Sequence, residues 1–190
     1  MNKALDSEIK YENENYAQLG DIDTFLNESG FDFEETEAGL HMTLHKTVDG
    51  NLIEIVFEAR QPLPDDIPDQ GEEEDMPSEN YCDFTVFITK GNEGMVVEAT
   101  SMDTEIAFNN VLHTDDMKKI RHLPRFERSL GEYNGPDFTT LDERIQTSIT
   151  EYLEGYGVNE NLAAFVECMS LDKDQRLYMK WLDGLRSFIN

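Results

Sequence analysis

Basic residues are scarce in this chain of 190 residues, which has 15 Lys and Arg against 41 Asp and Glu and a formal net charge of −26. Proteins bind nucleic acid chiefly by neutralising phosphates with Lys and Arg, so this balance disfavours general binding to RNA or DNA. The same charge repels anionic membranes. The expected partners are therefore cations: basic proteins, basic tails or metal ions.

Cysteines and long apolar runs are also rare. Cys82 and Cys168 lie far apart, and two free thiols in a reducing compartment are favoured over a disulfide. The longest apolar run covers only residues 162–166, whereas a bilayer-spanning helix needs about 20 residues. The N-terminal residues carry early acids and no apolar stretch typical of a signal peptide. We therefore expect no membrane insertion.

Two-residue periodicity in the middle of the chain predicts strands. Residues 41–48 and 51–58 alternate around Asp49-Gly50, a strong hairpin signal, and a second hairpin is predicted over residues 83–101. Further strands are predicted over residues 105–113 and 125–133. In residues 51–58 the acids Glu54 and Glu58 are expected on a solvent face. Phe84 and Phe87 must face opposite sides of the sheet, which favours burial of both faces in an oligomer.

Three- and four-residue periodicity predicts helices at both ends. Near the N-terminus the apolar positions include Leu5, Ile9, Tyr16 and Leu19. Thr140 and Glu143 form a capping-box pattern that predicts a helix ending near Gly155 and Gly157. Asn159 is predicted to cap a short helix, and Asp172 and Asp174 to open a separate last helix. Segregated strands and helices of this kind indicate an α+β fold with a single antiparallel sheet.

The segment of residues 62–80 separates two predicted strands and contains four of the six prolines and no Lys or Arg. Low hydrophobicity, proline and like charge predict that this acidic loop is disordered within a single domain of residues 1–190. It is either a solvated charge run or a mobile polyanion that attracts basic partners by electrostatic steering; we favour the second. Its acids are Asp65, Asp66, Asp69, Glu72, Glu73, Glu74, Asp75 and Glu79.

One basic segment interrupts the acidic chain. It contains Lys118, Lys119, Arg121, Arg125 and Arg128. It could contact RNA or phosphate, but phosphate binding needs a net positive potential. We favour a segment whose charge pairs with an acidic neighbour, either within the chain or in another subunit.

No motif for catalysis or cofactor binding is present. His41 and His45 are four residues apart, a spacing that suits zinc on a helix, but both fall on a predicted strand without a third ligand. They are interpreted as solvent-facing side chains. We therefore expect no enzyme activity, no cofactor and no metal site.

Three stretches together resemble the mitochondrial matrix acidic proteins, also called the mitochondrial glycoprotein family. They are ALDSEIKYENE near the start, LIEIVFEAR running into PLPDDIPD and then DFTVFITKGNEGMVVEATS, and LDERIQTSITEYLEGYGVNENLAAFVECMS followed by YMKWLDGLRSFIN. The resemblance covers nearly the whole chain, and the order and spacing of the three stretches make it specific. The chain departs from the family pattern between residues 112 and 138, where the basic segment lies.

The resemblance implies a twisted antiparallel sheet of about seven strands, flanked by one N-terminal helix and two to three C-terminal helices, in a doughnut-shaped homotrimer. It implies a non-catalytic scaffold or chaperone of the mitochondrial matrix. Such a protein would support mitochondrial RNA processing (including mRNA maturation or editing), translation and ribosome assembly through basic RNA-binding or ribosomal proteins, with RNA bound only indirectly. A direct RNA-binding factor using residues 118–128 is the alternative. The residues implied in helix pairing and oligomer contacts are Leu5, Ile9, Trp181, Leu185 and Phe188.

Overall fold

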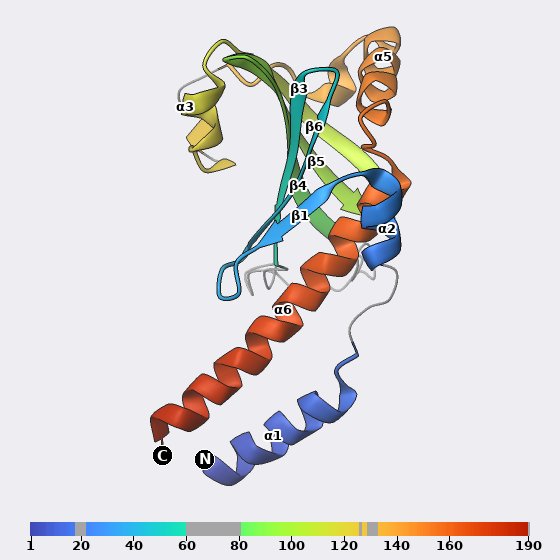
Figure 1. Ribbon diagram of the computed structural model, residues 1–190. Coiled ribbons are helices and arrows are strands. Elements are labelled where there is room, and N and C mark those ends of the chain that lie inside the picture. Colours follow the sequence, from blue (N-terminus) through green and yellow to red (C-terminus); the bar gives the residue numbers. More distant parts are fainter. Residues whose placement is uncertain (18–21, 60–80, 126, 129–132, 190) are drawn as a thin grey trace, which may run out of the picture.

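The computed structural model of the chain describes residues 1–17, 22–59, 81–125, 127–128 and 133–189. One antiparallel sheet is crossed on one face by a long C-terminal helix that continues well beyond the sheet (Figure 1). The expected α+β class is confirmed. The helices are α1 (Asn2–Asn15), α2 (Ile22–Ser29), α3 (Met117–Arg121), η1 (Phe138–Thr140), α5 (Glu143–Glu154) and α6 (Glu160–Ile189). The strands are β1 (Asp32–Glu35), β2 (His41–Val48), β3 (Asn51–Glu58), β4 (Tyr81–Lys90), β5 (Glu93–Met102) and β6 (Glu105–Thr114).

The strands follow one another across the sheet in chain order, each antiparallel to its neighbour. The β2–β3 hairpin turns at Asp49 and Gly50, whose φ angles of 51° and 80° are the left-handed conformation that such a turn requires. The described residues form six strands rather than about seven. The strand expected at residues 125–133 is wrong where the structure describes it, because Glu127 and Arg128 donate backbone hydrogen bonds to the Pro124 carbonyl in a helical turn. Proline favours the first turn of a helix, which accounts for the difference.

The face of the sheet that lies under α6 holds the main core. Alternate residues of β2 to β5 point into it, including Leu44, Ile55 and Val86, all fully buried. Phe165 of α6 stacks on Phe25 of α2 with ring centroids 4.4 Å apart. Since aromatic side chains bury large apolar areas, these contacts fix α2 and the first half of α6 against the sheet.

Residues 160–189 form one helix of 30 residues, so the two separate helices expected here are wrong. Asn159 does cap its start, because the Asn159 Oδ1 accepts from the backbone N–H groups of Asn161 and Leu162 at 3.1 and 3.3 Å. Asp172 and Asp174 lie inside the helix and not in a first turn. Asp172 is buried, and its carboxylate accepts hydrogen bonds from the Tyr16 hydroxyl and from Arg176, one turn further along α6.

The start of α5 also differs from the capping-box prediction. Asp142 is the N-cap, and its Oδ1 accepts from the backbone N–H of Arg144 at 3.0 Å. Thr140 belongs to η1, where its hydroxyl donates to the Asp137 carbonyl. The expected stop is present, since α5 ends at Glu154 and Gly157 has a φ of 85°.

The opposite face of the sheet is covered in part by α3. Phe87, Val96 and Leu112 pack there against Met117 and Ile120. Phe84 lies in the main core and Phe87 on this second face, so the prediction that they face opposite sides is confirmed. The cover over Phe87 comes from the same chain, and burial on both sides of the sheet at this point therefore needs no second subunit.

Candidate functional site

Helix α1 lies antiparallel along the second half of α6, and together they form an arm that projects from the sheet (Figure 1). Polar side chains link the two helices along their length. Arg186 Nε lies 2.8 Å from Asp6 Oδ1, and the Tyr178 hydroxyl donates to Glu8 at 3.1 Å. The arm therefore joins the two ends of the chain.

The five apolar residues implied in helix pairing and oligomer contacts divide into two sets. Leu5, Ile9 and Leu185 are half-buried. Trp181 and Phe188 are 57% and 89% exposed. The Trp181 ring stacks on Tyr178 with a centroid separation of 6.0 Å. Trp181 and Phe188 are seven positions apart, which places them on the same side of α6. Exposed large apolar side chains gathered in this way mark the arm as a candidate interaction surface.

A buried ionic cluster joins the base of the arm to the sheet. Lys173 of α6 is fully buried, and its Nζ lies 2.7 Å from Glu35 Oε2 of β1. Arg176 binds both Glu35 (2.9 Å) and Asp172 (2.7 Å), and the Tyr16 hydroxyl donates to Asp172 at 2.8 Å. Three separate parts of the chain thus meet at this cluster.

The surroundings of the cluster shift two pKa values in opposite directions. Burial would raise the pKa of Glu35, but hydrogen bonds from Arg176 and Lys173 outweigh burial and hold it below its ordinary value of 4.5. Burial and the hydrogen bond to Asp172 raise the pKa of Tyr16 to about 12. The structure therefore favours the charged form of Glu35 and the neutral form of Tyr16.

The basic segment, residues 117–128, lies across the second face of the sheet. Arg128 is buried, and its Nη1 lies 2.5 Å from Glu98 Oε1. Its Nε donates to the Leu123 carbonyl at 3.1 Å, and its guanidinium lies 4.9 Å from the centroid of the Phe87 ring. Arg128 is thus an internal ion-pair partner, and its charge is withheld from solvent.

Two more arginines of the basic segment bind acids of the sheet. Arg125 contacts Glu98 at 2.9 Å and Asp83 at 3.0 Å, and Arg121 pairs with Glu54. Glu54 and Glu98 are both buried, so the expectation that Glu54 faces solvent is wrong. The alternation in β3 correctly places Glu54 on the face opposite the main core. The prediction of exposure failed because no local signal in the sequence indicates that the basic segment covers that face.

The remaining candidate residues are on the surface. Lys118 and Lys119 are exposed. His41 and His45 lie on β2, where His41 Nδ1 is 3.0 Å from Glu58 Oε1 and His45 lies between Asp32 and Glu34 at 3.9 and 4.0 Å. Each histidine of this pair thus has carboxylates of neighbouring strands beside it.

The acidic loop of residues 62–80 lies outside the described residues, but the strands on either side of it are described. Strand β3 ends at Glu58 and β4 begins at Tyr81. Both residues line a cavity of about 810 Å³ between the sheet and the basic segment, together with His41, Asp83 and Arg125. A ligand drawn to this end of the sheet would meet a surface of mixed charge.

Both cysteines are free, as expected. Burial raises the pKa of Cys82 to about 12, which keeps the thiol protonated and unreactive at neutral pH. Burial also raises the pKa of Cys168. Within the described parts of the chain, none of the helices combines the length and the hydropathy that crossing a bilayer requires.

The fold and the charge define an acidic α+β protein in which a six-stranded antiparallel meander is backed by one long C-terminal helix paired with the N-terminal helix. The model of the mitochondrial glycoprotein family matches residues 5–189, and the chain belongs to this family. The expected family, with its mitochondrial acidic proteins, is thereby confirmed.

Two curated relatives match most of the chain. The mitochondrial acidic protein mam33 of Schizosaccharomyces pombe is 28% identical over 98% of this chain and 76% of its own length. An uncharacterised mitochondrial protein of Arabidopsis thaliana is 26% identical over 89% of this chain and 66% of its own length. The chain is thus shorter than both relatives.

Two solved structures share the fold. A Leishmania major protein of unknown function, described as a sequence homologue of human p32, superposes with a TM-score of 0.81 at 20% identity, over 100% of this chain and 97% of the other. The p22 protein of Trypanosoma brucei superposes with a TM-score of 0.75 at 22% identity, over 100% and 96%. At these identities the likeness concerns the fold alone.

Proposed function

We propose that this protein is a non-catalytic acidic scaffold of the mitochondrial matrix that binds basic proteins. The observation that carries the proposal is that most of the chain's few Lys and Arg side chains are paired with acids of the same chain. At least nine of the 15 Lys and Arg side chains form ion pairs with acids of the same chain, and the excess of 26 acids has no basic residue to neutralise it. The nine are Lys10, Arg121, Arg125, Arg128, Arg144, Lys173, Arg176, Lys180 and Arg186.

Basic RNA-binding or ribosomal proteins are the partners that suit this acidic surface, because they carry the opposite charge. Through them the protein would support mitochondrial RNA processing, including mRNA maturation or editing, and translation or ribosome assembly. RNA would be bound indirectly. The acidic loop of residues 62–80, which holds eight of the 41 acids in 19 residues, is the proposed first contact, because charge complementarity accelerates encounter.

Replacing the eight loop acids by Asn and Gln changes the formal net charge from −26 to −18 (26 − 8). We expect the loop variant to bind a basic mitochondrial partner more weakly, with a shallower dependence of affinity on salt. The measurement is affinity purification from mitochondria with and without ribonuclease, followed by mass spectrometry and by titration of a recovered partner at several salt concentrations. Basic proteins that persist after ribonuclease and are lost with the loop variant would support the proposal.

A matched control separates the loop from total charge. It neutralises eight exposed acids elsewhere and therefore has the same net charge as the loop variant. Equal weakening in both variants would assign binding to the whole acidic surface and remove the special role of the loop. Partners that vanish with ribonuclease would instead indicate an RNA bridge. The control positions are Asp23, Glu28, Glu105, Glu143, Glu151, Glu154, Glu160 and Asp183.

Direct RNA binding by residues 118–128 remains the second candidate function, and the ion pairs of the basic segment weigh against it. Arg121, Arg125 and Arg128 already have carboxylate partners. A phosphate would have to compete with these acids for the guanidinium groups. A gel shift of RNA by the purified protein at physiological salt would favour this candidate over the scaffold.

A homotrimer is part of the proposal. The exposed Trp181 and Phe188 give the arm an apolar surface to bury. Strands β1 and β6 are the outer strands of the sheet, and among the described residues the outer edge of β6 has one isolated bridge, between Asn110 and Asp137. We expect light scattering to give about 66 kDa (3 × 21.9 kDa). The double substitution Trp181→Ser/Phe188→Ser is expected to shift the particle toward 21.9 kDa while the single chain stays folded. A wild-type mass of one chain would contradict the trimer.

A further inference from the structure

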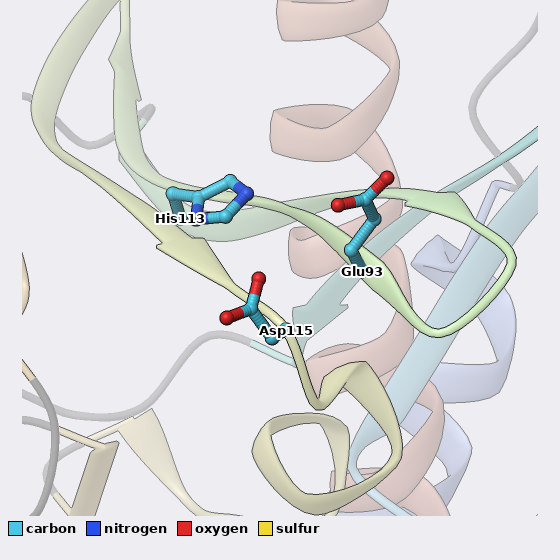
Figure 2. A group of neighbouring side chains, drawn as sticks. All are labelled: Glu93, His113 and Asp115. Atoms are coloured by element: carbon cyan, nitrogen blue, oxygen red, sulfur yellow. The ribbon is translucent and has the colours of Figure 1, made fainter.

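Three side chains with metal-ligand chemistry gather where β5 begins and β6 ends. They are Glu93, His113 and Asp115 (Figure 2). One carboxylate oxygen from each acid and one imidazole nitrogen all lie within 4.8 Å of one another. All three side chains are exposed and can be reached directly from solvent.

The pairing of β5 with β6 sets this arrangement. Gly94 lies opposite Thr114, and Met95 lies opposite His113. Because side chains alternate along a strand, Glu93, which precedes Gly94, lies on the same face as Met95 and His113. Asp115 is the first residue after β6. The group thus lies at the end of the β5–β6 ladder.

The backbone around Asp115 is held by hydrogen bonds to the neighbouring turn. Asn92 Nδ2 donates to the Asp115 carbonyl at 2.8 Å, and the backbone N–H of Met117 donates to the Asn92 carbonyl at 2.8 Å. Neither bond uses the Asp115 carboxylate. Ligands on fixed backbone lose less freedom on binding an ion than ligands on a loose loop.

We propose that Glu93, His113 and Asp115 form a site for Zn²⁺. Zinc binds imidazole nitrogen at about 2.0–2.1 Å and carboxylate oxygen at about 2.0–2.2 Å, and sites with three protein ligands leave a fourth position open. The three ligand atoms are already close enough that small side-chain rotations would bring them around one ion. The imidazole distinguishes this group from an ordinary acidic cluster, since Mg²⁺ and Ca²⁺ prefer oxygen ligands alone.

The local charge favours a dication. The group carries two carboxylates on a chain of net charge −26. Lys90 lies opposite Glu93 in the β4–β5 register and is a nearby positive charge that opposes a bound cation. Removing this charge by Lys90→Gln is therefore expected to strengthen zinc binding, and an unchanged or lower affinity would argue against an ion beside Glu93.

The test is a calorimetric titration of the full chain with Zn²⁺ in excess Mg²⁺, which occupies ordinary carboxylate sites. We expect one Zn²⁺ per chain. Loss of an outer-shell partner of a metal ligand typically costs about 10–100-fold in affinity, so loss of the ligand in His113→Gln should cost at least about tenfold. His41→Gln is the matched control, because His41 is also an exposed strand histidine beside a carboxylate. Circular dichroism checks that both variants fold.

Co²⁺ supplies a second measurement, since its visible absorption depends on the ligands and the geometry around the ion. We expect the band of the Co²⁺-loaded protein to change in His113→Gln and not in His41→Gln. Equal zinc affinity in the two variants would overturn the proposal, because the ion would then be held diffusely by the acidic surface. Absence of zinc binding above the Mg²⁺ background would also overturn the proposal. That result would mean that the three side chains are solvated separately and do not share an ion.

Discussion

The substitution Glu98→Leu is expected to lower the free energy of unfolding by about 3–5 kcal/mol, the usual cost of leaving a buried charge without its partner. Glu98 is 6% exposed and binds both Arg128 and Arg125. Without Glu98, the guanidinium of Arg128 stays buried, and its remaining neighbours among the described residues include the Thr85 hydroxyl, the Leu123 carbonyl and the Phe87 ring but no second carboxylate. Urea unfolding at a fixed chain concentration measures the loss.

The double substitution Glu98→Leu/Arg128→Met removes both charges and should recover most of the stability, because apolar replacements of a buried ion pair are often neutral. Asp83→Asn is the matched control, since it breaks only the half-exposed pair with Arg125 and should cost no more than about 1 kcal/mol. If Glu98→Leu cost no more than Asp83→Asn, the contact between the basic segment and the sheet would be a loose surface association, and its arginines would be available to other ligands.

The hairpins could be predicted from the sequence because their signals are local. Alternation of apolar and polar residues on either side of Asp49-Gly50 fixes both the turn and the faces of β2 and β3. Alternation along β4 likewise predicts that Phe84 and Phe87 lie on opposite faces. The helical turn after Pro124 was missed because residues 125–133 also contain the apolar residues of a strand pattern, and the binding of Arg128 to Glu98 depends on a contact 30 positions away in sequence.

The continuity of α6 could not be predicted for a related reason. Asp172, Lys173 and Asp174 look like a polar break between two apolar stripes, and acids are favoured in the first turn of a helix. In the folded chain Asp172 and Lys173 are buried because Tyr16, Glu35 and Arg176 satisfy them. The candidate zinc group was also missed, because Glu93 and His113 are far apart in sequence and come together only through the pairing of β5 with β6.

The cluster around Lys173 leads to the second large expected effect. Glu35→Ala removes the carboxylate that faces the fully buried Lys173 and leaves its ammonium group with the Thr36 carbonyl. The expected loss in the free energy of unfolding is about 3–5 kcal/mol. Glu37→Ala is the control two residues away, because the pair of Glu37 with Lys180 is largely exposed and should contribute no more than about 1 kcal/mol.

Glu35→Gln tests the electrostatic origin of this effect through its pH dependence. The hydrogen bonds from Arg176 and Lys173 hold the pKa of Glu35 below its ordinary value of 4.5, so the unfolded chain binds a proton more readily than the folded chain. The stabilisation is therefore fully present above pH 4.5 and is lost as the pH falls below 4.5 toward the lowered pKa. Gln cannot titrate, so the free energy of unfolding of the variant should fall less steeply with acid than that of the wild type. Equal slopes would mean that Glu35 gains nothing from its charge, and that packing around Lys173 and Arg176 holds the arm to the sheet.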